Sequence, residues 1–180
     1  MNDSRHISRR STRLAGYNYA SNGAYVVTLC SADRRPLFGR IRDGEMHTSQ
    51  IGAIVEREWR RTEELRPGVL LDAFVLMPNH LHGVLLIDLP GNDQMNEKSA
   101  GFLVPSRSVS AIVSGIKAAV SSVAVKQDLH GVESLWQRGF YDRIIRSETE
   151  LLRFREYITN NPLQWELDRY FEQDVGGDLI

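Results

Sequence analysis

The sequence predicts an α+β fold in which helices pack on one face of an antiparallel sheet. Short β-rich segments alternate with longer segments of helical periodicity, in the order β-α-β-β-α-β-α. Two of the strands follow one another with only a turn between them, and no internal repeat interrupts the order. Elements of this kind and order are typical of one layered α+β domain.

The first half of the chain supplies a strand, a loop and a helix. Residues 24–30 (AYVVTLC) are rich in β-forming side chains and predict a strand. Residues 33–44 contain a proline and two glycines and predict a loop. Residues 48–65 predict a helix, because apolar side chains recur there at helical spacing, and a Pro-Gly pair ends it.

The middle of the chain supplies two strands and a second helix. Residues 69–77 and 80–89 predict strands, and Pro78-Asn79 separates them. Residues 106–127 predict a helix with a well-formed apolar stripe: Val109, Ile112, Val113, Ile116, Val120 and Val123.

The last elements are an extended segment and a helix with clear ends. Residues 135–146 read as extended, and the helix covers 147–160. Ser147 and Glu150 fit a capping box at its start, and Pro162 forces its end. The first six elements match a ferredoxin-like split βαβ, with the last helix added, although the same order is compatible with other α+β sheets.

Length and composition indicate one domain. We expect that domain at 1–165, with a basic arm at about 1–22 and an acidic tail at 166–180. A single cysteine excludes a disulfide framework. We see no apolar run near the roughly 18 residues of a membrane span and no secretory signal, so we expect a cytoplasmic protein without a membrane partner.

The charge is unevenly distributed. The net charge is -1, but residues 1–42 hold eight arginines against two aspartates. Basic side chains with interleaved tyrosines suit single-stranded nucleic acid, whose bases expose faces for stacking. A solvated, flexible terminus explains the same composition, so charge alone leaves both interpretations open.

Two histidines stand at the start of a predicted strand. Alternate strand residues share a face, so His80 and His82 point the same way and Leu81 points the other way. Two imidazoles about 7 Å apart along a strand can converge on one metal ion. Two histidines that merely cap a strand are the alternative, since a lone His-x-His is a weak motif.

The last helix carries a second pair of polar side chains. Tyr157 and Asn161 are spaced i, i+4 and lie at the margin of the apolar stripe. A tyrosine at the edge of a core and an asparagine that ends a helix explain them equally well. The segment 136–142 (WQRGFYD) mixes aromatics, an arginine and a flexible glycine, and suits either an edge strand or a contact to phosphate or bases.

Taken together, these motifs resemble the single-tyrosine HUH transposases, and more narrowly the REP-associated tyrosine transposases of bacteria. The resemblance rests on residues 77–84 (MPNHLHGV), 136–142 (WQRGFYD) and 156–162 (EYITNNP), and it extends from about Arg9 to Trp165. It implies His80 and His82 as metal ligands, Tyr157 as nucleophile and Asn161 as the third ligand, where many relatives carry glutamine.

The resemblance also implies a reaction. The expected activity is metal-dependent cleavage and rejoining of single-stranded, hairpin-forming repetitive DNA through a covalent 5′-phosphotyrosine, as in DNA transposition. Imidazole and oxygen donors suit Mg²⁺ or Mn²⁺. The protein would act as a monomer or homodimer. Candidate DNA contacts are Arg9, Arg10, Arg13, Arg138 and Arg143, with Lys117 a weaker one.

Three alternatives remain open at this point. Tyr141 is the second candidate nucleophile, because it follows a glycine closely and adjoins Asp142. A hairpin-binding module that no longer cuts would need the same fold. A phosphoesterase with paired histidines would need a second His-x-Ser/Thr pair on a neighbouring strand, whereas the other histidines, His6, His47 and His130, are isolated.

Overall fold

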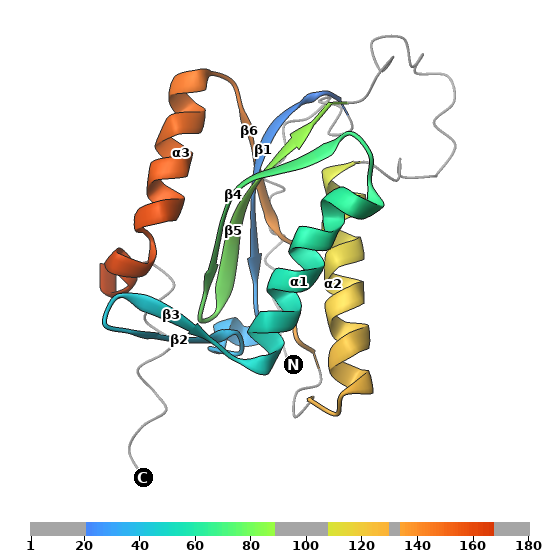
Figure 1. Ribbon diagram of the computed structural model, residues 1–180, viewed down its shortest axis with the longest axis vertical. Coiled ribbons are helices and arrows are strands. Elements are labelled where there is room, and N and C mark those ends of the chain that lie inside the picture. The colour runs from blue at the N-terminus through green and yellow to red at the C-terminus, as the bar shows by residue number, and fades with distance from the viewer. Residues whose placement is uncertain (1–20, 89–107, 130–133, 168–180) are drawn as a thin grey trace, which may run out of the picture.

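The computed structural model describes residues 21–88, 108–129 and 134–167. Figure 1 shows a central sheet with helices on both sides. Most of the predicted basic arm, including Arg9, Arg10 and Arg13, lies outside the described residues, and so does the acidic tail beyond Leu167.

The central sheet has four strands in the order β4-β5-β1-β6. They are β1 (Gly23–Cys30), β4 (Val69–Met77), β5 (His80–Ile87) and β6 (Tyr141–Ile145). Every neighbouring pair is antiparallel, as the sequence predicts. Because β5 lies between β1 and β4 and opposes both, β1 and β4 run parallel without pairing.

Two helices close one face of this sheet. They are α1 (Gln50–Leu65) and α2 (Val109–Lys126), which pack against each other and against the sheet. Tyr25, Val27 and Leu29 of β1 alternate onto this face and are fully buried there. The main core therefore lies between the sheet and the α1–α2 pair.

The third helix, α3 (Glu148–Asn160), covers the opposite face, so the molecule has three layers (Figure 1). Ser147 caps α3, as predicted, and its hydroxyl accepts a hydrogen bond from the backbone N–H of Glu150 at 3.2 Å. A smaller cluster holds the helix in place, consisting of Val26, Val84, Ile145 and Ile158.

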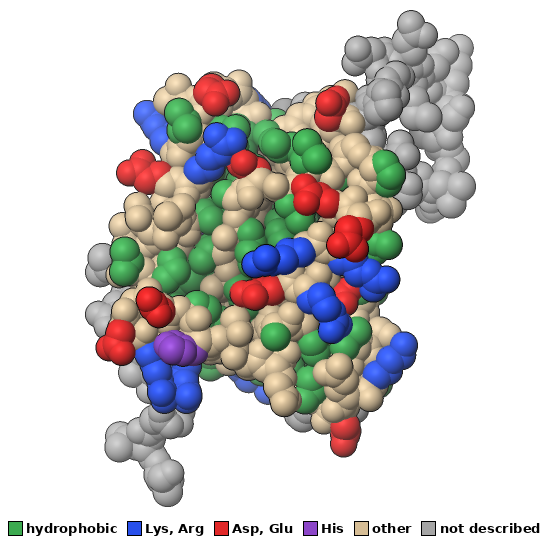
Figure 2. All heavy atoms as spheres, viewed as in Figure 1, with side chains coloured by type: hydrophobic (Ala, Val, Ile, Leu, Met, Phe, Trp, Pro, Cys, Tyr) green, Lys and Arg blue, Asp and Glu red, His purple; other side chains and the backbone are tan. Residues whose placement is uncertain are grey.

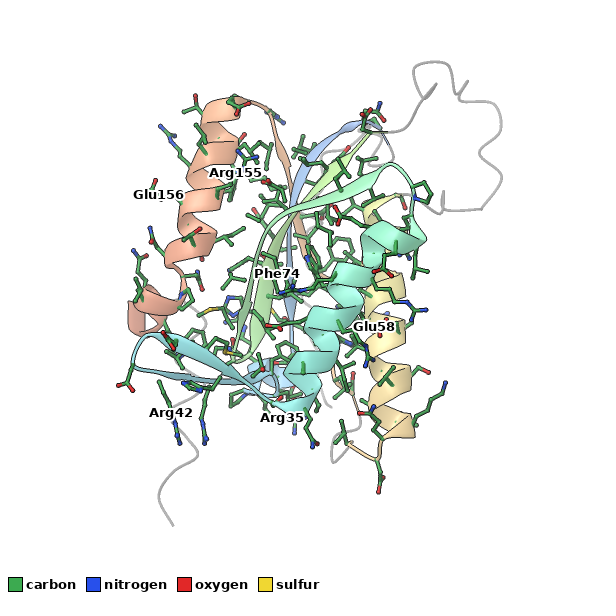
Figure 3. The ribbon with its side chains drawn as sticks, in the orientation of Figure 1. Arg35, Arg42, Glu58, Phe74, Arg155 and Glu156 are labelled. Carbon is green, nitrogen blue, oxygen red and sulfur yellow. The ribbon has the colours of Figure 1, made fainter. Side chains whose placement is uncertain are left out.

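An ion pair joins α3 to the edge strand β4. Arg155 donates two hydrogen bonds to Asp72, at 2.8 and 2.9 Å, from the face of α3 that looks toward the sheet (Figure 3). Figure 2 shows apolar side chains along the middle of this side of the molecule, where β4 runs between α3 and α1, with charged side chains around them. The pair therefore spans the open edge of the sheet and fixes α3 beside it.

The predicted loop at 33–44 is wrong in part, because residues 39–42 form a strand. β2 (Gly39–Arg42) and β3 (Glu45–Thr48) pair as an antiparallel hairpin. Asp43 and Gly44 have φ angles of 53° and 75°, as a tight turn with two left-handed residues requires. The hairpin also moves the start of α1 from 48 to Gln50, after the Ser49 cap.

Other boundaries differ by a few residues. α2 begins at Val109 rather than 106, because Ser108 caps it. Only 141–145 of the predicted extended segment 135–146 is a strand, and β5 ends at Ile87 rather than 89. After α3 the chain continues as the 3-10 helix η4 (Pro162–Leu167).

The helix α2 is more apolar than expected, since the sequence showed no apolar run near the length of a membrane span. By length and composition α2 would suffice to cross a membrane, with a mean hydropathy of 1.4. Its buried side chains, however, lie in the main core against α1 and the sheet. This packing is that of a core helix in a globular domain.

Candidate active site

The two histidines of β5 meet on the face of the sheet that α3 covers. The Nε2 atoms of His80 and His82 are 3.1 Å apart, and both side chains are buried. Leu81 points into the opposite core, as strand alternation predicts. The structure therefore brings the two predicted ligands together at the start of β5.

The inner ring nitrogens have partners that orient both imidazoles. The Nδ1 atom of His80 lies 2.8 Å from Oδ1 of Asn79, an acceptor, so this Nδ1 carries the proton and Nε2 is left with a lone pair. The Nδ1 atom of His82 lies 2.8 Å from the hydroxyl of Thr28. Such outer hydrogen bonds are the usual means of holding metal-binding histidines.

Tyr157 reaches the same point from α3. Its hydroxyl is 3.4 Å from Nε2 of His82, and the two rings meet edge to face with centroids 5.3 Å apart. The buried neighbour Ile158 anchors the helix to the sheet, which leaves Tyr157 at the margin and 42% exposed. A substrate can therefore approach this hydroxyl from solvent.

Asn161 lies one helical turn after Tyr157 and is 2% exposed. Its Oδ1 has no hydrogen-bond partner within the described part of the chain. Four residues later Trp165 stacks on His80, with centroids 6.0 Å apart. Asn161 thus lies between two residues that contact the histidines: Tyr157, which contacts His82, and Trp165, which contacts His80.

This donor set fits a divalent metal. The converging Nε2 atoms of two imidazoles and the buried amide oxygen of Asn161 at the end of α3, which lacks a donor among the described residues, are the nitrogen and oxygen ligand types that such a metal takes. Across residues 21–88, 108–129 and 134–167 no group of three His, Cys, Asp or Glu side chains offers a competing site.

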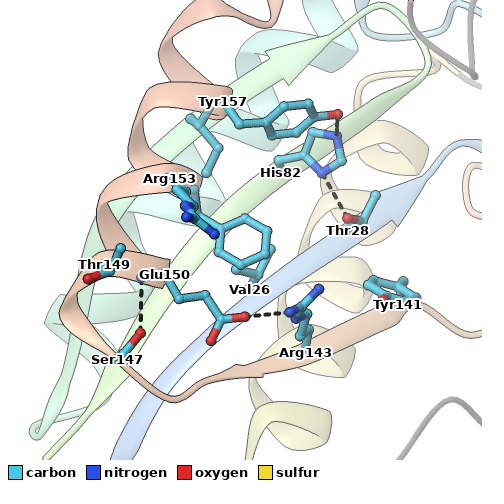
Figure 4. Close-up of a pocket in the computed structure, with 12 residues that line it drawn as sticks. Val26, Thr28, His82, Tyr141, Arg143, Ser147, Thr149, Glu150, Arg153 and Tyr157 are labelled. Carbon is cyan, nitrogen blue, oxygen red and sulfur yellow. Dashed lines mark hydrogen bonds and ion pairs between the residues drawn. The ribbon is translucent and has the colours of Figure 1, made fainter.

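A cleft of about 610 Å³ opens beside Tyr157, between α3 and strands β1 and β6 (Figure 4). Tyr141 and Arg143 of β6 face Glu150 and Tyr157 of α3 across it. Its lining combines aromatic, apolar and polar side chains: Val26, Thr28, His82, Tyr141, Arg143, Ser147, Thr149, Glu150, Arg153, Phe154, Tyr157 and Ile158.

Arg143 is the predicted DNA contact that the structure places in this cleft. Its guanidinium binds Glu150 at 2.6 Å and lies over the ring of Phe154, 5.6 Å from the centroid. The backbone N–H of Arg146 and the charge of Arg143 lower the pKa of Glu150, which keeps this carboxylate ionised. Arg138 is exposed in the loop before β6 and does not line the cleft.

The side chain of Lys117 is held by contacts within the protein. Its ammonium donates to the carbonyl oxygens of Gln137, at 2.9 Å, and Gly139, and lies 5.5 Å from the centre of the Trp136 ring. Burial lowers the pKa of Lys117 to about 8. This lysine therefore fixes the loop that leads into β6, and the weaker prediction of a DNA contact at Lys117 stays a prediction.

Three residues of the site escaped sequence reasoning: Thr28, Asn79 and Trp165. Asn79 directly precedes His80, so its position offered a signal. Thr28 is the cross-strand neighbour of His82, which only the register of β1 and β5 reveals. Trp165 lies in η4, beyond the predicted helix end.

Comparison with known proteins finds a sequence relative and a solved structure with a similar fold. No profile of a known protein family matches the chain. A Haemophilus influenzae protein described as uncharacterised is 37% identical over 169 residues, which cover 91% of this chain and 93% of the relative. A solved structure of a REP-associated tyrosine transposase bound to a REP hairpin superposes with a TM-score of 0.58 at 16% identity, over 87% of this chain and 76% of the other. The chain therefore belongs to one family with the Haemophilus influenzae protein, and its fold is that of a REP-associated tyrosine transposase, the group that its motifs resemble.

Proposed function

We propose that this protein cleaves and rejoins single-stranded, hairpin-forming DNA, with Tyr157 as the nucleophile, as in DNA transposition. The observation that carries the proposal is the contact of His82 with both His80 and the hydroxyl of Tyr157. A fold shared with a transposase that was solved on a REP hairpin supports the choice of substrate. Action on DNA implies the cytoplasm of a bacterial cell.

The residues that would hold a metal are His80, His82 and Asn161. A bound Mg²⁺ or Mn²⁺ would supply charge neutralisation and orientation at the scissile phosphate. The protein prepares for this without the ion, since Asn79 fixes the proton of His80 on the inner nitrogen and Thr28 orients His82. The two Nε2 atoms then face each other at 3.1 Å, and that of His82 also faces the hydroxyl of Tyr157.

Tyr157 would carry out the covalent step. A tyrosine hydroxyl has a reference pKa near 10 and is a poor nucleophile while protonated. In the proposed step the hydroxyl gives its proton to solvent and its oxygen bonds to phosphorus. The bond from phosphorus to the 3′-oxygen breaks, and that oxygen takes up a proton. The products are a 5′-phosphotyrosine and a free 3′-hydroxyl.

Rejoining needs no nucleotide cofactor. The phosphotyrosine retains a phosphodiester bond, so attack by another 3′-hydroxyl reverses the step and releases Tyr157. Because Tyr157 is exposed beside the cleft, the cleaved DNA strand and the strand with the attacking 3′-hydroxyl can both reach it. Duplex DNA would withhold its bases from that cleft, which favours a single strand.

The direct test uses labelled hairpin oligonucleotides from repeats that flank the gene, with Mg²⁺ or Mn²⁺, on a denaturing gel. Wild-type protein should form a metal-dependent protein–DNA adduct, Tyr157→Phe should form none, and Tyr141→Phe should form it. Loss with Tyr141→Phe alone would move the nucleophile. Binding without an adduct, across several hairpins and both metals, would support a non-cutting hairpin-binding module instead.

A further inference from the structure

We propose that the cleft between β6 and α3 holds one unpaired base of the substrate, next to the scissile phosphate, stacked on the ring of Tyr141. The inference rests on the proposed function and adds a base-binding site to it. It gives Tyr141 a role that differs from the nucleophile considered above, since stacking needs the ring and not the hydroxyl.

The register of the sheet sets the distance between this site and the histidines. His82, Thr28 and Tyr141 form one row across β5, β1 and β6, because Thr28 pairs with both of the others. Neighbouring strands lie about 4.8 Å apart, which separates the backbones of His82 and Tyr141 by about 10 Å. A phosphate bound at the histidines would thus leave its own nucleoside within reach of Tyr141.

The cleft has the surfaces that a base requires. Tyr141 is 40% exposed although its ring is large, and its side chain lines the cleft. Val26, Phe154 and Ile158 supply further apolar lining. Aromatic side chains in such settings stack on single-stranded bases whatever their identity, because every base has a π-face.

Polar groups stand where the edge of the base would lie. Arg143 is held against Glu150 and over Phe154, so its guanidinium is already ordered before a ligand arrives. The hydroxyls of Ser147 and Thr149 also line the cleft. A cleft of about 610 Å³ lies within the usual range for small-molecule sites and has room for one nucleoside.

The experiment measures binding in the Tyr157→Phe background, where no covalent step intervenes. The wild-type cleavage position is mapped first, and 2-aminopurine or an abasic nucleotide is then placed at each position on either side of it. Proteins with Tyr141, Tyr141→Ala or Tyr141→Phe are titrated, and Leu152→Ala serves as the control, since Leu152 is exposed on α3 and lies outside the cleft lining.

At one flanking position 2-aminopurine fluorescence should be quenched by the protein with Tyr141 or Tyr141→Phe, and not by Tyr141→Ala. Loss of stacking should weaken binding by about 10-fold or more. An abasic nucleotide at that position should weaken binding equally, and the two changes together should cost no more than one. Leu152→Ala should bind as the parent does.

Additive losses, or equal quenching with Tyr141→Ala, would overturn the inference. Failure of the proposed function would look different. A wild-type protein that binds hairpin DNA but forms no adduct would refute cleavage. The base site would then be decided by placing 2-aminopurine at every unpaired position in turn and comparing the proteins with Tyr141 and Tyr141→Ala. A protein that binds no hairpin would refute both proposals.

Discussion

Successive residues of β5 serve two different surfaces. Leu81 and Leu85 enter the core beneath α1 and α2, where they are fully buried among other apolar side chains. His80 and His82 enter the opposite face, where they meet each other, Tyr157 and Trp165. One strand thus supplies stability on one side and the proposed chemistry on the other, which a two-residue repeat makes possible.

The two faces also differ in how completely they are covered. Two helices close the core face, whereas a single helix with a small apolar cluster covers the site face. The cleft exists because α3 leaves part of β1 and β6 uncovered. A face with fewer helices can admit a substrate, and an ion pair from Arg155 to Asp72 then keeps the lone helix in place.

The largest contrast should appear between neighbouring residues of β5. His82→Ala should reduce adduct formation on the order of 1000-fold while the protein stays folded, because the proposed metal ligand beside the proposed nucleophile is lost. Leu81→Ala should lower the free energy of unfolding by about 2–5 kcal/mol. Adduct assays and urea unfolding, at a temperature where circular dichroism finds both variants folded, measure the two effects.

Leu81→Ala should keep adduct formation per folded molecule within a few-fold of wild type, as should the volume-conserving control Leu81→Met. If His82→Ala and Leu81→Ala each reduced both adduct formation and stability to a similar extent, the two faces of β5 would not have the separate roles proposed.

The next effect concerns the close packing of the core face. A Cβ atom on Gly83 would lie 2.3 Å from the ring of Trp59, which itself stacks on Phe74. Gly83→Ala should therefore lower the free energy of unfolding by about 1–3 kcal/mol. In a Trp59→Leu background the same change should cost clearly less. Equal costs in both backgrounds, measured by urea unfolding, would refute the proposed clash.

Asn161 offers a test of the site face that does not depend on cleavage. Its Oδ1 is buried without a partner within the described residues, so Asn161→Leu should leave the melting temperature unchanged or higher when metal is absent. Added Mn²⁺ should raise the melting temperature of wild type by binding the folded state. The variant should need about 10-fold more Mn²⁺ for the same rise. Identical metal titrations would remove Asn161 from the ligand set.

The smallest effect is a pH dependence at the loop before β6. Burial lowers the pKa of Lys117 from 10.5 to about 8, so the folded state releases this proton at lower pH than the unfolded chain. Between these values the unfolded state binds more protons, and the contribution of Lys117 to the free energy of unfolding rises with pH. Below pH 8 both states are protonated and this contribution stays constant.

Urea unfolding of wild type and Lys117→Met at pH 7 and pH 9.5 measures the change. The difference between the two proteins should move in favour of wild type at the higher pH. A difference that stays the same at both values would show that Lys117 titrates as it would in water.

Much of this arrangement could be predicted from local patterns. Strand alternation predicted that His80 and His82 share a face, and the capping box at Ser147 predicted where α3 begins. The β2–β3 hairpin was missed although Asp43-Gly44 is a strong turn signal, because its strands have only four residues each and carry charged side chains.

The rest depends on contacts between distant segments. Thr28 meets His82 only because β1 and β5 pair in one particular register. The contact of Tyr157 with His82 requires α3 to lie on the face opposite α1 and α2, and the helical periodicity of α3 shows which side is apolar but not which surface it covers. The resemblance to a known family supplied that pairing.

The most direct test of the account identifies the residue that carries the DNA. The trapped adduct is digested with nuclease and trypsin, and mass spectrometry locates the nucleotide-bearing peptide. The two tyrosines fall in different tryptic peptides, with Tyr157 in residues 156–169 and Tyr141 in residues 139–143. We predict a nucleotide on Tyr157 in the peptide 156–169, joined through its 5′-phosphate. A nucleotide on Tyr141, or on any residue outside α3, would contradict it.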